Sequence, residues 1–208
     1  MEHRLAARNL VLIGMPGVGK STLGVLLAKR TSRRFVDTDV DLQARYGRTL
    51  QEVIATDGLA AFREIEERCV LDLDCRDTVV ATGGSVVYSA RAMHHLRSLG
   101  VIVHLHLPLD LVGARVSDFE SRGVVRAPGQ SLASLFAERQ PLYQQYADIT
   151  VDCSRQTHAQ LVERIAAAEE RAWRAALGPG PRGAGGEPGG TGVGSPPLRS
   201  RRSGGDRP

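Results

Sequence analysis

Nine residues near the start of the chain have the types and the spacing of a phosphate-binding loop. The segment Gly14-Met15-Pro16-Gly17-Val18-Gly19-Lys20-Ser21-Thr22 fits the pattern G-x-x-x-x-G-K-[ST]. Its glycines let the backbone curl so that several N–H groups point at a polyphosphate, and the following helix adds the positive end of its dipole. Lys20 can reach the β- and γ-phosphates, and the Ser21 hydroxyl can ligate Mg²⁺. This phosphate loop predicts a nucleoside triphosphate site built from Gly17, Val18, Gly19, Lys20, Ser21 and Thr22.

The loop alone leaves three classes of protein open: a small-molecule kinase, a GTPase-like switch, and a motor or remodelling ATPase. The last two usually carry an apolar strand that ends in an acidic residue for the Mg²⁺ shell. The apolar segment at 101–107 is followed by Pro108, and the one at 79–81 is followed by Thr82 and Gly83. Neither segment supplies that acid, which favours a kinase.

Two acids follow the second predicted strand, in Asp37-Thr38-Asp39. If the strand continued through them, both carboxylates would point to the same side. One could then hold the metal through water while the other met a substrate hydroxyl. An exposed turn with two solvated acids is the alternative for so short a motif.

Two arginines and a pair of glycines complete the candidate site. Arg63 lies on a predicted helix whose apolar face carries Phe62 and Ile65, and Arg139 lies on a later helix. Gly83 and Gly84 follow a buried strand, where they would let the backbone approach a ligand closely. Taken singly, these features also fit solvated helix charges and a plain strand-to-helix turn.

Together, the motifs resemble those of the shikimate kinase family over about residues 9–175. The resemblance rests on these segments: Gly14–Thr22, Phe35-Val36-Asp37-Thr38-Asp39, Gly47-Arg48 with Asp57-Gly58, Phe62-Arg63-x-x-Glu66, Thr82-Gly83-Gly84 and Glu138-Arg139-x-Pro141-Leu142-Tyr143. It implies a P-loop kinase fold and transfer of a phosphoryl group from MgATP to the 3-hydroxyl of shikimate, in aromatic amino-acid biosynthesis.

The resemblance also implies a role for each site residue. Lys20, Asp39 and Arg122 would be catalytic, and Ser21 and Asp37 would support Mg²⁺. Asp39, Arg63, Gly83, Gly84 and Arg139 would bind shikimate, with the two arginines on its carboxylate. Arg115 and Arg122 would join the phosphate loop in binding ATP.

Two departures from the family pattern bear on the substrate. Ser85 stands where the family usually has a third glycine. The expected lid, at about 118–130, lacks the Pro-Leu-Leu that usually follows the lid arginine. Arg122 and Arg126 are both candidates for that arginine, and the spacing from Arg115 favours Arg122. A related kinase for another small hydroxy acid and a nucleotide-binding regulatory module without catalysis therefore remain alternatives; a nucleoside monophosphate kinase fits the acids and arginines less well.

Short apolar runs alternate with helical periodicity along the chain. Strands are expected at 10–13, 35–36, 79–81, 101–107 and 149–151, and helices at 21–30, 50–55, 59–73, 89–98, 109–117, 131–146 and 157–177. Such runs are typical of a parallel sheet covered on both faces. We predict a three-layer α/β fold with five parallel strands and a site beyond their carboxyl ends.

Composition divides the 208 residues at about position 177. Residues 178–208 hold 11 of the 23 glycines and a net charge of +3, which leaves +1 of the total +4 for residues 1–177. We expect a single folded domain at 1–177 and a disordered tail at 178–208. The near-neutral domain does not suggest nucleic acid, and no apolar run approaches the roughly 18 residues of a membrane span. Three cysteines without metal-ligand spacing, and no signal peptide, fit a reduced cytoplasmic protein, which we expect to be a monomer.

Overall fold

The computed structural model describes residues 9–115, 124–127 and 129–177, with side chains up to residue 174. The expected tail at 178–208, Arg122 and much of the expected lid lie outside the described residues. Five strands form one parallel sheet in the order β2-β3-β1-β4-β5. They are β1 (Asn9–Ile13), β2 (Arg34–Asp37), β3 (Thr78–Ala81), β4 (Gly100–His106) and β5 (Ile149–Asp152). This confirms the predicted sheet.

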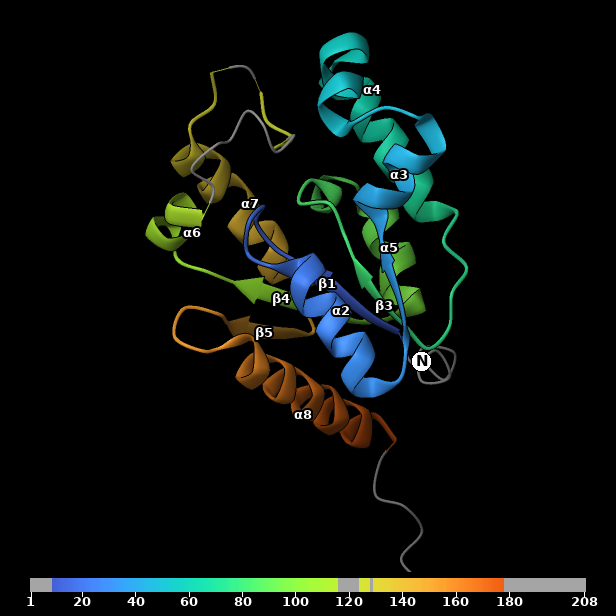
Figure 1. The fold of residues 1–208 in the computed structure, drawn as a ribbon, viewed down its shortest axis with the longest axis vertical. Coiled ribbons are helices and arrows are strands. Elements are labelled where there is room, and N and C mark those ends of the chain that lie inside the picture. Colours follow the sequence, from blue (N-terminus) through green and yellow to red (C-terminus); the bar gives the residue numbers. More distant parts are fainter. Residues whose placement is uncertain (1–8, 116–123, 128, 178–208) are drawn as a thin grey trace, which may run out of the picture. The chain divides into compact units, whose positions relative to one another are not determined.

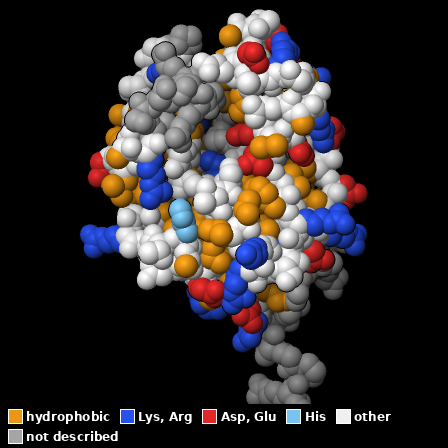
Figure 2. Space-filling view, in the orientation of Figure 1, with side chains coloured by type: hydrophobic (Ala, Val, Ile, Leu, Met, Phe, Trp, Pro, Cys, Tyr) orange, Lys and Arg blue, Asp and Glu red, His pale blue; other side chains and the backbone are white. Residues whose placement is uncertain are grey.

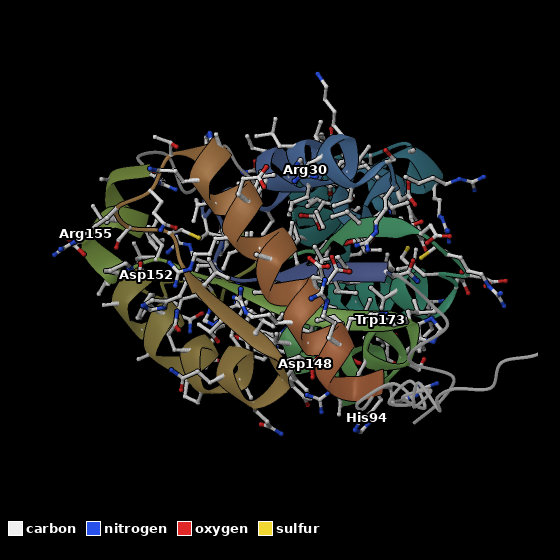
Figure 3. The ribbon with its side chains drawn as sticks, turned by 90° about the horizontal axis from the view of Figure 1, so that it is seen from below. Arg30, His94, Asp148, Asp152, Arg155 and Trp173 are labelled. Carbon is white, nitrogen blue, oxygen red and sulfur yellow. The ribbon has the colours of Figure 1, made fainter. Side chains whose placement is uncertain are left out.

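Helices cover both faces of the sheet, which makes the three predicted layers (Figure 1). On one face lie α2 (Lys20–Thr31) and α8 (His158–Leu177). The other carries α4 (Leu50–Leu71), α5 (Ala90–Leu99) and α7 (Leu132–Tyr146), with the short α6 (Leu109–Arg115) beside α7. Seen from below, α8 crosses its side of the molecule from the loop at Asp152 and Arg155 to Trp173, and Arg30 of α2 lies beside it (Figure 3). No helix of the described part is long and apolar enough to span a membrane.

The core explains why the central strands are continuous apolar runs. Every residue of β1 and β3 is buried, because helices shield both faces of these strands. A second, smaller core lies apart from the sheet, between α3 (Thr38–Tyr46) and α4, and it includes Val125 of the segment after the expected lid. The sheet therefore has its own core, while α3, α4 and Val125 pack together in a separate cluster.

The structure corrects one local prediction and confirms another. Thr38 and Asp39 do not continue β2, because α3 begins at Thr38 and Asp37 caps it: the Asp37 carboxylate accepts hydrogen bonds from the backbone of Asp39 (3.0 Å) and Val40 (3.4 Å). The strand condition on which the alternation argument depended is therefore not met, although the charges of both acids act on Lys20. The predicted break between the segments 50–55 and 59–73 is confirmed, since Gly58 has φ of 85° and interrupts the helical backbone of α4.

Candidate active site

The phosphate loop joins β1 to α2 with the geometry that its glycines predict. A Cβ on Gly14 would lie 2.6 Å from the Leu105 carbonyl oxygen, so the loop leaves the sheet where no larger residue fits. The Lys20 ammonium folds back over the loop and donates to the carbonyl oxygens of Gly14 (2.8 Å) and Met15 (3.0 Å). Arg115 donates to the Val18 carbonyl oxygen (3.4 Å), so this predicted ATP-binding arginine rests on the loop.

A cavity of about 330 Å³ opens above the loop, at the carboxyl ends of the strands. Figure 2 shows the surface hollowed above the start of α2, with basic colour inside the hollow and acidic colour on the side of α3. The predicted residues that line the cavity are Gly17, Gly19, Lys20, Ser21, Thr22, Asp39, Gly83, Gly84 and Arg139. The fold thus brings the phosphate loop, one acid, the glycine pair and one arginine to the same space.

Four predicted residues lie outside the lining of this cavity. Val18 is buried within the loop, and Asp37 caps α3. Arg115 contacts the loop through the Val18 carbonyl oxygen. Arg63 lines a neighbouring cavity of about 190 Å³. The two arginines predicted to bind one carboxylate therefore line different cavities. Ser85 lines both of these cavities.

A buried carboxylate, that of Glu66, and a half-buried one, that of Asp39, meet at Gly83. A Cβ on Gly83 would lie 2.2 Å from Glu66 Oε1 and 2.7 Å from Asp39 Oδ1, so both oxygens crowd the space that glycine leaves open. Glu66 Oε2 accepts a hydrogen bond from the Ser85 hydroxyl (2.7 Å), whereas Glu66 Oε1 has no partner among the described residues. A buried oxygen without a partner is costly when the carboxyl group is ionised, which disfavours the ionised form of Glu66.

Burial shifts the pKa values of Asp39, Glu66 and Lys20. It raises the pKa of Asp39 to about 6, against the opposing effect of Lys20. Burial also raises the pKa of Glu66 to about 7, with the Ser85 hydrogen bond opposing it and the Asp39 charge adding to it. Burial, together with the charge of Arg139, lowers the pKa of Lys20 to about 8, although Asp39 opposes that shift. Strongly shifted groups that converge on one cavity are typical of functional sites.

Arg139 is fully buried and two of its three nitrogens are held by protein groups. Its Nε donates to the Tyr88 hydroxyl (3.2 Å), and its Nη2 donates to the Val125 carbonyl oxygen. Its Nη1 has no hydrogen-bond partner among the described residues and lies 3.1 Å from where a Cβ on Gly84 would be. A buried guanidinium with an unused donor edge suits an anionic ligand such as a carboxylate.

The sequence-based prediction assigned no role to three residues that shape this site. Glu66 belonged to a quoted motif, and a signal existed for it, since it follows Phe62 by four residues on the buried face of α4. Tyr143 also belonged to a quoted motif and Tyr88 to none, and neither was assigned a role. Tyr143 is fully buried and donates to the Gly84 carbonyl oxygen (2.7 Å), which fixes the glycine pair.

Of the expected lid, the described part begins at Val124. Val124 and Val125 line the cavity, and Val125 also packs into the smaller core. Arg126 donates to the Gln130 carbonyl oxygen (2.5 Å) and does not line the cavity. Arg122, the favoured lid arginine, lies outside the described residues, so its role stays a prediction.

Comparisons with known proteins identify this arrangement. The family described as shikimate kinase matches residues 16–169, a range that holds Lys20, Asp39, Arg63 and Arg139. The chain belongs to the shikimate kinase family. A shikimate kinase from Chromobacterium violaceum is 36% identical over 162 residues, which cover 76% of this chain and 88% of that protein. One from Pseudomonas syringae is 34% identical and covers 77% and 95% of the two chains.

Solved structures of shikimate kinases share the fold. The shikimate kinase from Acinetobacter baumannii in complex with shikimate matches with a TM-score of 0.74 and 27% identity, over 82% of this chain and 97% of that one. The enzyme from Aquifex aeolicus matches with a TM-score of 0.70 and 30% identity, over 82% and 99%. The sheet order and helical layers described above are therefore those of the shikimate kinase P-loop fold.

Proposed function

We propose that the protein catalyses the ATP-dependent phosphorylation of the 3-hydroxyl of shikimate, which gives shikimate 3-phosphate and ADP. The observation that carries the proposal is the content of the 330 Å³ cavity: the phosphate loop with Lys20, Asp39, and Arg139, whose Nη1 has no hydrogen-bond partner among the described residues, all line it. A triphosphate and a hydroxy acid would meet between them. Membership of the family and the shikimate complex of the Acinetobacter baumannii relative support the choice of acid.

The phosphate loop, Lys20, Asp39 and Arg139 each have a task in this reaction. The backbone of the phosphate loop and the Lys20 ammonium would bind the phosphates and neutralise charge that builds on the transferred group. Asp39 would accept the proton of the attacking hydroxyl, and a pKa of about 6 leaves it ionised at neutral pH but still basic enough for this task. Arg139 would hold the carboxylate and so orient the ring, because phosphoryl transfer depends mainly on in-line positioning.

Mg²⁺ would enter with ATP, and the residues present fit it. The exposed Ser21 hydroxyl lines the cavity beside Lys20, and oxygen ligands are those Mg²⁺ prefers. When bound, the ion supplies charge neutralisation for the phosphates. Asp37 already accepts two backbone N–H groups through Oδ1, so we assign it only support through water. The described residues hold no cluster of three or more His, Cys, Asp or Glu side chains for a metal, and Mg²⁺ bound with a nucleotide needs only one or two protein ligands.

Three further assignments belong to the proposal. Arg115 would lie beside the adenine, and Arg122 would complete charge neutralisation when the lid closes. Arg63 would approach the substrate carboxylate from the neighbouring cavity. The expected monomer also stays a prediction, which light scattering on the purified protein would check.

A coupled assay of ADP release with a panel of small hydroxy acids tests the function. We expect turnover with shikimate, a ³¹P signal of a 3-phosphate ester in the product, and loss of turnover in Lys20→Ala. The matched control is Lys29→Ala, which removes the chain's other lysine, on α2. Turnover with another acid and none with shikimate would show that the other acid is the substrate. No turnover with any acid would contradict the kinase assignment.

A further inference from the structure

One aromatic side chain stands between the two arginines that the proposed function places on the carboxylate. Tyr88 ends the short 3₁₀ helix η1 (Val86–Tyr88), whose first turn is closed by the bond from Tyr88 N to the Ser85 carbonyl oxygen (3.0 Å). This turn follows the glycine pair directly, so the backbone that approaches the ligand also places Tyr88. The side chain is half-buried and lines the smaller cavity together with Arg63 and Glu66.

The hydroxyl of Tyr88 orients Arg139. It accepts the hydrogen bond from Arg139 Nε (3.2 Å), and the Val125 carbonyl oxygen accepts a hydrogen bond from Nη2. Two protein acceptors therefore fix the plane of the guanidinium group. The Nη1 edge is then the part left for a ligand. An unrestrained guanidinium would lose rotational freedom when it bound a carboxylate, and a restrained one has less to lose.

The ring of Tyr88 orients Arg63. The guanidinium carbon of Arg63 lies 4.2 Å from the ring centroid, which is the geometry of a cation–π contact. Arg63 Nε is buried without a hydrogen-bond partner among the described residues, so the ring is the contact that the structure shows for this end of the side chain. The guanidinium carbon of Arg139 lies 5.2 Å from the same ring. A single side chain therefore contacts both guanidinium groups.

Tyr88 also connects these arginines to the end of the expected lid. Burial raises the pKa of the Tyr88 hydroxyl and the Glu138 charge adds to that shift, while the Glu138 carboxylate accepts a hydrogen bond from Gln130 Nε2 (2.6 Å). Gln130 also closes the turn at Ala127: its side-chain oxygen accepts a hydrogen bond from Ala127 N, and its backbone N–H donates to the Ala127 carbonyl oxygen. The orientation of Arg139 thus depends on both Tyr88 and the segment that leads out of the lid.

We propose that Tyr88 is a positioning residue for the substrate carboxylate, which it serves by holding Arg139 through its hydroxyl and Arg63 through its ring. The inference rests on the proposed function, and it adds a residue that the motifs of the family did not include. Tyr88 does not itself need to touch the substrate. Its effect should therefore fall on binding of the acid and not on binding of ATP.

Two variants separate the hydroxyl from the ring. Tyr88→Phe keeps the ring and removes the acceptor for Arg139; Tyr88→Leu removes both contacts. We expect Tyr88→Phe to raise the KM for shikimate by about three- to tenfold, as for loss of one hydrogen bond to a charged group, with kcat and the KM for ATP within about twofold of wild type. Tyr88→Leu should raise the KM for shikimate further, by about ten- to fiftyfold.

A neutral substrate gives the second readout. Shikimate methyl ester lacks the charge that the arginines recognise, so its kcat/KM should be nearly the same in Tyr88→Phe and wild type. Tyr46→Phe is the matched control, because Tyr46 is an exposed tyrosine at the end of α3. It should leave every constant unchanged.

The outcomes distinguish the two hypotheses. An inactive wild-type protein would contradict the proposed function. An active wild type with an unchanged KM for shikimate in both Tyr88 variants would overturn the role of Tyr88 alone. Equal rises in the KM values for shikimate and ATP, or equal losses with the acid and its ester, would also overturn it, since a merely structural role would produce them.

Discussion

The hydroxyl of Ser85 donates a 2.7 Å hydrogen bond to Glu66 Oε2, and both residues are buried. Ser85 occupies the position where the family pattern usually has glycine, so this bond is a feature of the present chain. A glycine there could not donate from a side chain, and the carboxylate of Glu66 would keep one fewer partner. Burial raises the pKa of Glu66, and the Ser85 hydroxyl opposes that rise, because a hydrogen bond donated to the carboxylate stabilises its ionised form.

Ser85→Ala should destabilise the protein more at high pH than at low pH. At pH 8.5 Glu66 is ionised and loses its donor, which should lower the free energy of unfolding by about 1–2 kcal/mol. At pH 5.5 Glu66 is largely protonated, so the loss should be smaller. Urea unfolding at the two pH values measures the difference. Ser98→Ala is the control: Ser98 is exposed and donates to the neutral carbonyl of His95, so its effect should not change with pH.

Glu66→Gln should make stability less dependent on pH. Burial raises the pKa of Glu66 from 4.5 to about 7, so the folded state binds this proton more tightly than the unfolded state does. The free energy of unfolding therefore falls as pH rises from about 4.5 to about 7. Without the carboxyl group, the variant should gain about 2 kcal/mol relative to wild type between pH 5 and pH 8.

Glu52→Gln provides the contrast for that experiment. The pKa of Glu52 is lowered, first by the backbone N–H of Thr49, so Glu52 is ionised at both pH 5 and pH 8. Its replacement should change stability by the same amount at the two pH values. A pH-independent effect of Glu66→Gln would mean that Glu66 does not titrate in this range.

Gly83→Ala should impair catalysis with little effect on ATP binding. The added Cβ would overlap Glu66 Oε1 and Asp39 Oδ1, and so would displace the proposed base. We expect kcat to fall by about 100-fold, since small errors in position are costly in transfer reactions. The matched control is Gly113→Ala on α6, where the Cβ would meet Leu132 at an ordinary 3.5 Å. Activity of Gly83→Ala within threefold of wild type would show that the two carboxylates can move aside.

The activity should decline on both sides of neutral pH. Lys20 must be protonated to bind phosphate, and its pKa is lowered to about 8 by burial, so kcat/KM for ATP should fall about tenfold per pH unit above pH 8. Below pH 6 the protonation of Asp39 should reduce turnover. Lys20→Arg tests the assignment, because a guanidinium stays charged: whatever its overall rate, this variant should lose the alkaline decline and keep the acidic one. A wild-type profile that stays flat to pH 9.5 would place the pKa of Lys20 elsewhere.

The phosphate loop and the parallel sheet were predictable because their signals are local. The loop is defined by nine consecutive residues, and the strands by short apolar runs that only a sheet covered on both faces explains. The ends of those runs also placed the site, since the carboxyl ends of parallel strands meet at one edge. Even the break in α4 was visible, as a glycine between two periodic segments.

One local cap and several contacts between distant segments decided the rest. Asp37 caps a helix that the alternation of acids did not reveal, and this turns Asp39 into the first turn of α3. Arg139 meets Tyr88 across 51 residues, and Ser85 meets Glu66 across 19. The pKa of a carboxyl group depends on the elements that bury it, and so does the presence of a polar atom without a hydrogen-bond partner. Neither the spacing of residues along the chain nor its composition reveals those elements. The sequence by itself therefore determined the phosphate-loop motif, the fold and the residues that could serve a substrate, while the packing of α4, η1 and α7 decided which donors and acceptors are left for a ligand.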